Sequence, residues 1–329
     1  MAPGYEVVGI GNALVDVIAH VDDAFLAEHG LVKGSMALVD GERAVALHRS
    51  MAPAFERSGG SAANTMAGLA SLGSRVAFVG RVGADRLGAV FAADIRATGV
   101  DFTTEAADGP TPTGRCLVAV TPDAERTMST LLGAAADLSP GDVDDDLVGD
   151  ACLTYLEGYL VEQELARDAF HRAAEAAHRA GRRVAVTLSD SFCVDRRRRE
   201  FLTLVEAGAD VVFANEDELR LLYATDDADE ALSRAERHCP LVVMTRGAAG
   251  STVVDRGRRH DVAAVPVTRV VDTTGAGDLY AAGFLHGLAR GWDVTTCARL
   301  GAVAAAEVIA HVGARPETSL ADLVAPLLA

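Results

Sequence analysis

The sequence is poor in aromatic residues and in positive charge. Phe, Trp and Tyr make up 5% of the 329 residues, whereas hydrophobic residues as a whole reach 50%, so any core must be built largely from small aliphatic side chains. Such a composition suits helices that pack closely on a parallel sheet. The 30 Lys and Arg are outnumbered by 47 Asp and Glu, which gives a formal net charge of −17. A field of that sign repels nucleic-acid phosphates and anionic lipids, so we expect neither nucleic acid nor membrane as a partner.

The sequence also lacks paired cysteines, a leader segment and a long apolar run. None of its five cysteines forms a CxxC pair, which argues against a zinc site or a redox motif. Residues 1–6 show no basic segment followed by an apolar core, so no signal peptide is predicted. No uncharged apolar stretch reaches the ~20 residues that span a bilayer. We therefore expect a cytoplasmic protein.

Short apolar runs alternate with helical patterns along most of the chain, and the alternation is regular after residue 150. This order predicts an α/β fold with a doubly wound, mostly parallel sheet flanked by helices. Two stretches differ, about 12–58 and 113–132, and the second has the pattern of a hairpin. We predict that both form a small β-sheet lid inserted in the main α/β body of a single domain spanning residues 1–329.

The run from Asp272 to Asp278 is the most informative segment. An apolar pair at 270–271 predicts a strand before it, and small apolar residues after it predict a helix. The backbone of residues 275–277 would then turn N–H groups outward at a helix N-terminus, where free donors and the helix dipole bind anions. Asp278 is thus a carboxylate beside an anion cradle, placed to take a proton from an attacking hydroxyl. The alternative for a GxGD fragment alone is an Asp that stabilises the first turn of a core helix.

A second glycine-rich turn, Gly59-Gly60, opens another predicted helix. Ser61 suits its N-cap, and Asn64 projects one turn further on with a donor and an acceptor on the same amide. The two glycines would permit close approach of the backbone to a ligand. An ordinary capped turn is the alternative, and it explains Ser61 but not Asn64.

Asn12 and Asp16 come after the first apolar run. A carboxylate among aliphatic residues is costly to bury without partners, so the hydroxyl groups of a ligand are one explanation for Asp16. A solvated carboxylate on the polar face of an edge strand is the other.

Two further motifs come directly after predicted strands. Asn215 and Glu218 share one helix face, and their oxygens could organise water around magnesium, although a capped acidic first turn is the common alternative. Thr245 and Gly247 could line a nucleotide or form an ordinary loop. No GxxxxGK[ST] motif occurs, and Gly9-Ile10-Gly11 lacks the third glycine of a dinucleotide fingerprint.

In combination, these motifs resemble the ribokinase/PfkB family of carbohydrate and nucleoside kinases over nearly the whole chain. The likeness rests on four motifs in the family's order: Gly59-Gly60 with Asn64, Asn215-x-x-Glu218, Thr245-x-Gly247 and Asp272-Thr-x-Gly-Ala-Gly-Asp278. The resemblance implies transfer of a phosphoryl group from ATP, with Mg²⁺, to a hydroxymethyl group of a small-molecule substrate.

The resemblance also assigns a role to each motif. Asp278 would be the catalytic base, and an anion hole would be formed by the backbone amides of Gly275, Ala276 and Gly277. The substrate's hydroxyls would be bound by Asn12, Asp16, Gly59, Gly60, Ser61 and Asn64. The nucleotide would contact Asn215, Glu218, Thr245 and Gly247, with Glu218 holding Mg²⁺ through water. In several members a monovalent cation, K⁺, is held at the positions of Asp272, Thr274 and Gly313. Glu317 departs from the family pattern, because many members carry a small hydroxyl residue there.

Three fragments, 11–16, 155–159 and 188–192, resemble adenosine kinases within the family. They favour a nucleoside, adenosine, phosphorylated on its 5′-hydroxyl. The lid would then supply an apolar wall for the base from residues such as Met36, Leu38 or Leu117.

Other substrates and roles remain as alternatives. A free sugar such as ribose or fructose is one, and a non-catalytic module that senses a nucleoside or sugar is another, although a sensor needs no base at Asp278. A sugar phosphate is disfavoured because no basic cluster is expected near the substrate residues, with Arg115 and Arg126 of the lid as the only candidates. The oligomeric state is left open, a homodimer being one option.

Overall fold

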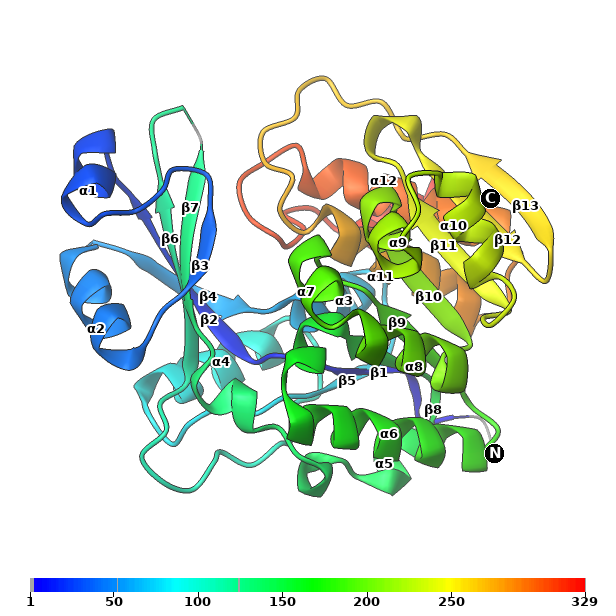
Figure 1. Ribbon diagram of the computed structural model, residues 1–329, viewed down its shortest axis with the longest axis horizontal. Coiled ribbons are helices and arrows are strands. Elements are labelled where there is room, and N and C mark those ends of the chain that lie inside the picture. The colour runs from blue at the N-terminus through cyan, green and yellow to red at the C-terminus, as the bar shows by residue number, and fades with distance from the viewer. Residues whose placement is uncertain (1–2, 52, 124, 329) are drawn as a thin grey trace.

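A large sheet and a small sheet organise the computed structural model, which describes residues 3–51, 53–123 and 125–328 (Figure 1). The large sheet has the strand order β13-β12-β11-β10-β9-β8-β1-β5. The strands from β5 to β11 in this order are parallel, and β12 and β13 continue the sheet as an antiparallel edge. Its strands are β1 (Tyr5–Ile10), β5 (Val76–Val79), β8 (Ala151–Glu157), β9 (Arg183–Thr187), β10 (Val211–Asn215), β11 (Leu241–Thr245), β12 (Ser251–Asp255) and β13 (Arg258–Val262). The predicted α/β fold with a mostly parallel sheet is confirmed.

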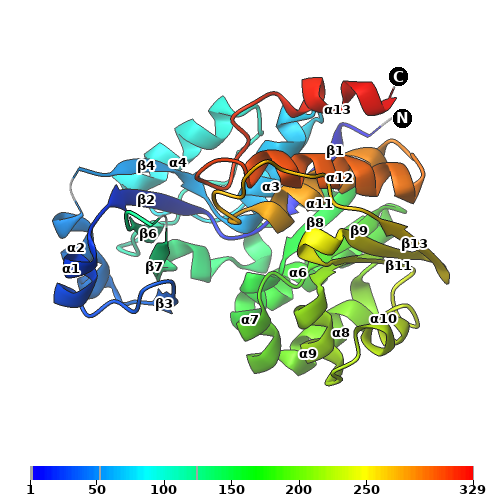
Figure 2. The ribbon, with the colours of Figure 1, turned by 90° about the horizontal axis from the view of Figure 1, so that it is seen from above.

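Helices cover both faces of the large sheet because its central strands are apolar on both sides. Figure 2 shows the two helical layers with the sheet between them. One layer contains α3 (Ser61–Ser71), α4 (Arg86–Ala97), α11 (Ala276–Ala289) and α12 (Val294–Val308), followed by α13 (Leu320–Leu328). The other contains α5 (Asp145–Gly149), α6 (Glu164–Arg179), α7 (Ser191–Arg196), α8 (Arg198–Gly208), α9 (Glu216–Tyr223) and α10 (Ala228–Ala235). Within the described part of the chain, no helix combines the length and the apolar character needed to cross a bilayer.

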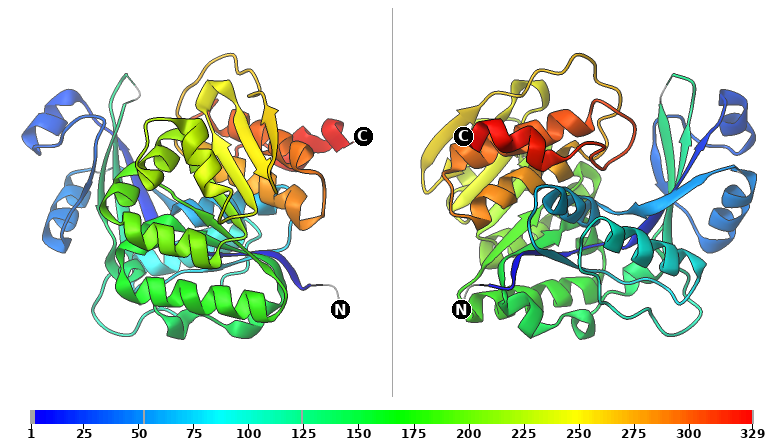
Figure 3. Two further views of the ribbon diagram at one scale, coloured as in Figure 1. Left: turned by 45° about the vertical axis from the view of Figure 1, so that its right-hand side comes forward. Right: turned by 180° about the vertical axis from the view of Figure 1, so that it is seen from behind.

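The small sheet is built from the two stretches that depart from the regular alternation. Its strand order is β3-β7-β6-β2-β4. The strands are β2 (Leu14–His20), β3 (Met36–Leu38), β4 (Phe55–Gly59), β6 (Gly114–Val120) and β7 (Arg126–Leu131), and α1 (Asp23–Glu28) and α2 (Gly41–Ser50) lie between them in sequence. As predicted, β6 and β7 form an antiparallel hairpin. Figure 3 shows this sheet projecting from the body of the molecule, to which it is joined at its base.

The two faces of the small sheet have different surroundings because side chains alternate along a strand. On β2, Val15 and Val17 are fully buried and pack in the same core as Leu26 and Leu47 of α1 and α2. Asp16 lies between them in sequence and therefore points to the opposite face, which is turned toward the large sheet.

Two local predictions are wrong. Val270 and Val271 form no strand: the N–H of Val271 donates to the carbonyl of Ile309 at the end of α12, and Val270 is half exposed. A pair of apolar residues is too short to pair with a neighbouring strand without further support. Ser61 is not an N-cap either, since Gly60 holds that position with φ of 102° and Ser61 is the first residue of α3. The hydroxyl of Ser61 is thereby free for another partner.

The contact between α11 and α12 fixes the helix that carries Asp278. Gly283 of α11 lies against the backbone of α12, where a Cβ on Gly283 would come within 2.5 Å of the Leu300 carbonyl. Gly301 of α12 meets the Tyr280 carbonyl in the same way, at 2.7 Å from its would-be Cβ. The two helices therefore touch backbone to backbone, and this close approach requires glycine on both.

Replacing Gly283 should therefore destabilise the protein. We expect Gly283→Ala to lower the free energy of unfolding by about 1–3 kcal/mol, because an added methyl group overpacks this contact. Urea denaturation would measure the change. Gly208→Ala on α8 is the matched control, since its Cβ would lie 3.8 Å from that of Ala174, an ordinary contact, and alanine favours a helix. Equal stability of the two variants would contradict the backbone contact.

Candidate active site

A cavity of about 540 Å³ opens between the small sheet and the carboxyl edge of the large sheet. In open α/β sheets this edge is where ligands bind. Thirteen of the residues predicted from the motifs line the cavity: Asn12, Asp16, Gly60, Ser61, Asn64, Asn215, Glu218, Thr245, Thr274, Gly275, Ala276, Gly277 and Asp278. Four others lie behind its wall or beside it: Gly59, Gly247, Asp272 and Gly313.

Asp278 lies in the first turn of α11, next to the predicted anion cradle. Gly275 is the N-cap of this helix, with φ of 80° in the left-handed region that favours glycine. The Asp278 carboxylate accepts a hydrogen bond from the Ser61 hydroxyl at 2.6 Å and one from the Asn64 amide nitrogen at 3.2 Å. Burial raises the pKa of Asp278 to about 6, although these two hydrogen bonds oppose the shift. The carboxylate is therefore mostly ionised at neutral pH and able to accept a proton.

The glycine pair before α3 makes room for other protein groups. A Cβ on Gly59 would lie 2.4 Å from a carboxylate oxygen of Asp16, and one on Gly60 would lie 2.1 Å from the carbonyl oxygen of Asn12. The sequence suggested that both glycines admit a ligand. In the structure they admit the side chain of Asp16 and the backbone of Asn12, which brings these two residues to the cavity.

Asp16 belongs to an inner strand, because β2 lies between β6 and β4. The alternative of a solvated carboxylate on an edge strand is thus wrong. Burial raises the pKa of Asp16, and the positive charges of Arg126, Arg315 and Arg57 oppose that shift. The expectation that only Arg115 and Arg126 could bring positive charge near the substrate residues is also wrong, since Arg57 and Arg315 act on Asp16 as well. Arg57 lies opposite Asp16 on β4, and Arg315 comes from the loop after α12.

Glu157 is a buried residue of the site that the motifs did not identify. It ends β8, where Oε1 accepts from the Asn12 side-chain amide at 2.7 Å and Oε2 accepts from the backbone N–H of Ala62 at 2.7 Å. Burial raises its pKa to about 7. A carboxylate among apolar residues is the signal that identified Asp16, and it could have identified Glu157 as well.

Asn12 keeps one polar atom for a ligand. Its Nδ2 is bound to Glu157, but its buried Oδ1 has no hydrogen-bond partner among the residues that the structure describes. A buried acceptor without a donor is costly, and a ligand hydroxyl would satisfy it. This observation supports a hydroxyl-bearing substrate beside Asp16.

The Asp272 carboxylate is surrounded by donors. It accepts from the backbone N–H groups of Thr274 and Gly313, each at 2.9 Å, and forms a buried ion pair with Arg126 of β7. A monovalent cation needs free oxygen ligands at this point, whereas here N–H groups and a guanidinium occupy the carboxylate. The residues around Asp272 therefore do not fit K⁺ in this structure, and Arg126 supplies the positive charge.

Asn215 and Glu218 form a capping box at the start of α9. The Asn215 Oδ1 accepts from the Glu218 N–H at 2.8 Å, and the Glu218 carboxylate accepts from the Asn215 backbone N–H at 2.9 Å. The geometry of a capped acidic turn is thus present, and both residues line the cavity as well.

Glu218 would hold magnesium through water, because both of its carboxylate oxygens already accept hydrogen bonds from Asn215. Burial raises the pKa of Glu218 to about 7, and a cation nearby would restore its charged form. Within residues 3–51, 53–123 and 125–328, no group of three or more His, Cys, Asp and Glu side chains is arranged to hold a metal. Glu218 would therefore act together with phosphate oxygens and water, which Mg²⁺ accepts readily. Thr245 lines the same end of the cavity, and Gly247 begins the following turn with φ of 53°.

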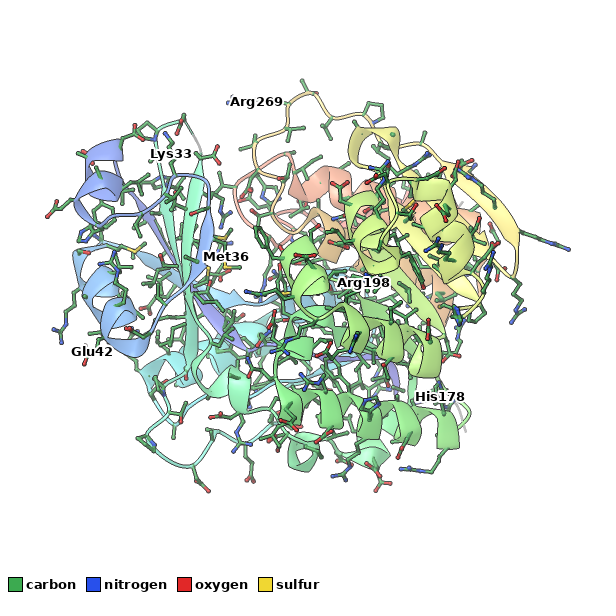
Figure 4. All side chains as sticks on the ribbon, in the orientation of Figure 1. Lys33, Met36, Glu42, His178, Arg198 and Arg269 are labelled. Carbon is green, nitrogen blue, oxygen red and sulfur yellow. The ribbon has the colours of Figure 1, made fainter. Side chains whose placement is uncertain are left out.

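The small sheet gives the cavity an apolar wall. Its apolar side chains are those of Leu14, Met36, Leu38, Cys116, Val118 and Met128, joined by the nearby Leu132. Figure 4 shows Met36 on the side of the small sheet that faces the rest of the molecule. Met36 and Leu38 were predicted here, but Leu117 was wrong: it alternates with Cys116 and Val118 on β6 and is buried in the core on the opposite face.

Comparison with known proteins agrees with this geometry. Residues 44–320 match the family described as "pfkB family carbohydrate kinase". An adenosine kinase structure from Sinorhizobium meliloti is 51% identical, with a TM-score of 0.91 and 99% of both chains covered. A probable sugar kinase from Rhizobium etli CFN 42 is 46% identical, with a TM-score of 0.92 and the same coverage. The 5-dehydro-2-deoxygluconokinase of Geobacillus thermodenitrificans is 28% identical over 76% of this chain and 78% of its own.

The family match covers well over half of the chain, and its two glycine-rich motifs meet at one cavity. A kinase of this family uses ATP and transfers a phosphoryl group to an alcohol. The chain belongs to the pfkB family of carbohydrate kinases and is a sugar or nucleoside phosphotransferase with an alcohol group as acceptor.

Proposed function

We propose that this kinase phosphorylates the 5′-hydroxyl of a nucleoside, adenosine, with ATP and Mg²⁺. The observation that carries the proposal is the composition of one face of the small sheet. There Asp16 pairs with Cys116 on the neighbouring strand, and Val118 and Met128 follow on the same face. A group that binds hydroxyls thus adjoins an apolar wall, as the ribose and base of a nucleoside require.

The free energy gained by burying the nucleobase favours a nucleoside over a free sugar. Covering a purine with the apolar wall removes apolar area from water at roughly 25 cal/mol per Å². A pentose or hexose offers little apolar area to that wall. The 51% identity to an adenosine kinase, over 99% of both chains, supports the same choice.

In the proposed reaction Asp278 is the catalytic base. Ser61 and Asn64 hold its carboxylate in place, and it takes the proton of the acceptor hydroxyl as that oxygen attacks. The backbone amides at Gly275, Ala276 and Gly277 stabilise the negative charge that develops on the phosphoryl group. ATP supplies this phosphoryl group, and Mg²⁺ beside Glu218 would neutralise phosphate charge.

A sugar kinase is the second candidate function. It is favoured by the 46% identity to a probable sugar kinase and by the likeness to a 5-dehydro-2-deoxygluconokinase. The charges around Asp16 do not decide between the two, since Arg126 and Arg315 are themselves paired with Asp272 and Asp94. A screen of acceptors that measures ADP release would separate them.

The role of Asp278 can be tested with an isosteric change. Asp278→Asn should lower turnover by roughly 10²–10⁴-fold while ATP binding and the fold are retained, because the amide cannot accept the proton. In the wild type, kcat/KM should fall below about pH 6, where the carboxylate becomes protonated. Asp293→Asn, which replaces an Asp at the start of α12 outside the cavity, is the control. Near-normal turnover of folded Asp278→Asn would remove this residue from the mechanism.

Asp16 should bind the acceptor and not ATP. We expect Asp16→Ala to weaken acceptor binding by about 1.5–3 kcal/mol, through the loss of hydrogen bonds to a charged group. The KM for each substrate, measured in the same assay, gives the comparison, with ATP as the internal control. Equal losses for ATP and acceptor would show that Asp16 does not belong to the acceptor site.

If adenosine is the acceptor, we expect its advantage over free sugars to lie mainly in tighter binding. Adenosine should have a far higher kcat/KM than ribose or fructose, mainly through a lower KM. Met36→Ala should raise the KM for adenosine more than that for a sugar, since Met36 belongs to the apolar wall. Val32→Ala, at an exposed position outside the cavity, is the control. Good turnover of a free sugar, with adenosine neither a substrate nor a competitor, would establish the sugar kinase instead.

A further inference from the structure

Arg315 is a buried arginine behind the catalytic carboxylate, in the loop that follows α12. Only 9% of the residue is exposed. Its Nε donates to Oδ1 of Asn64 at 3.3 Å, and its Nη1 donates to Oδ2 of Asp94 at 3.2 Å. None of the sequence motifs includes Arg315 or Asp94. Arg315 nevertheless contacts Asn64, and Asn64 in turn contacts Asp278.

The contact with Arg315 decides which way the Asn64 amide points. Arginine has only donors and stays protonated, so the amide oxygen of Asn64 must face it. The amide nitrogen is then turned toward Asp278, to which it donates at 3.2 Å. A reversed amide would place its oxygen against the Asp278 carboxylate and its nitrogen against a guanidinium, and both contacts are repulsive.

Asp94 on α4 holds Arg315 in this position. Its Oδ2 accepts from the Ser58 N–H at 2.8 Å and from the Ser58 hydroxyl at 2.5 Å, besides the bond from Arg315. Ser58 directly precedes the glycine pair that leads into α3. A continuous series of hydrogen bonds therefore runs from Ser58 to Asp278. Its intermediate members are Asp94, Arg315 and Asn64.

We propose that Arg315 is a positioning residue for catalysis, which together with Asp94 fixes the Asn64 amide so that its nitrogen faces Asp278. The inference rests on the proposed role of Asp278 as base, but not on the identity of the acceptor. Two simpler roles compete with it. Arg315 could serve stability alone through its ion pair with Asp94, or it could act on Asp16, whose charge it also faces.

A comparison of kcat with KM separates these roles. Arg315→Met should lower kcat by about 10- to 100-fold, because the Asn64 amide loses its fixed orientation beside a charged group. The KM for the acceptor should change much less. Asp94→Asn should lower kcat in the same direction by a smaller factor, because Arg315 loses its charged anchor. Arg81→Met, which removes the Asp142 ion pair away from the cavity, should leave kcat unchanged.

A double-mutant cycle tests whether Arg315 affects kcat through Asn64. If Arg315 acts through Asn64, then Arg315→Met should lower kcat little further once Asn64→Ala is present. Losses that multiply in the double variant would overturn the inference. It would also be overturned if folded Arg315→Met kept its kcat and lost only thermal stability, or if only the acceptor KM rose.

The Asp278→Asn variant distinguishes failure of the Arg315 proposal from failure of the proposed mechanism. If Asp278→Asn loses turnover while Arg315→Met keeps it, Asp278 remains the base and only the positioning role of Arg315 fails. If Asp278→Asn retains turnover, the proposed mechanism itself fails. Thermal unfolding with and without ATP, measured for every variant, ensures that kcat is compared only among folded proteins.

Discussion

The candidate site is organised around one constraint, the burial of the Asp278 carboxylate together with the donors that stabilise its charge. Burial disfavours the charge, and the pKa of Asp278 remains raised to about 6 even though the hydrogen bonds from Ser61 and Asn64 oppose the shift. The donors come from α3, which begins with Ser61 and carries Asn64 one turn later. The large sheet, the glycine turn before α3 and the close contact of α11 with α12 all serve to bring these two helix N-termini together.

The parts of the site that local sequence patterns encode could be predicted. The turn at 275–277, Asp278 and Asp16 were predicted from glycine spacing and from carboxylates placed among apolar residues, and all of them line the cavity. Glu157 carried the same signal and was overlooked. Arg315 and Asp94 carried none, because their positions near Asn64 arise only when distant segments fold together. Ser61 was predicted to be the N-cap of α3, but Gly60 holds that position and the Ser61 hydroxyl donates to Asp278.

Arginines offset part of the negative charge of the site, in a chain that as a whole carries a net charge of −17. Asp272 and Asp94 each pair with an arginine that also faces Asp16. These pairs are formed across the fold: Arg126 lies on the small sheet, whereas Asp272 precedes α11. The positive charge that a monovalent cation would bring to Asp272 is thereby provided by the chain itself.

The small sheet has a further consequence for how such an enzyme can change over evolutionary time. Along β6, Cys116 and Val118 face the cavity, while Leu117 and Ala119 belong to the core shared with the helices behind the sheet. Substitutions at Cys116 and Val118 therefore alter the shape and polarity of the cavity wall without changing the side chains of β6 that pack in the core behind the sheet. The cavity wall and the core behind the sheet are thus carried by alternate residues of the same strand, which leaves the wall able to vary while that core is preserved.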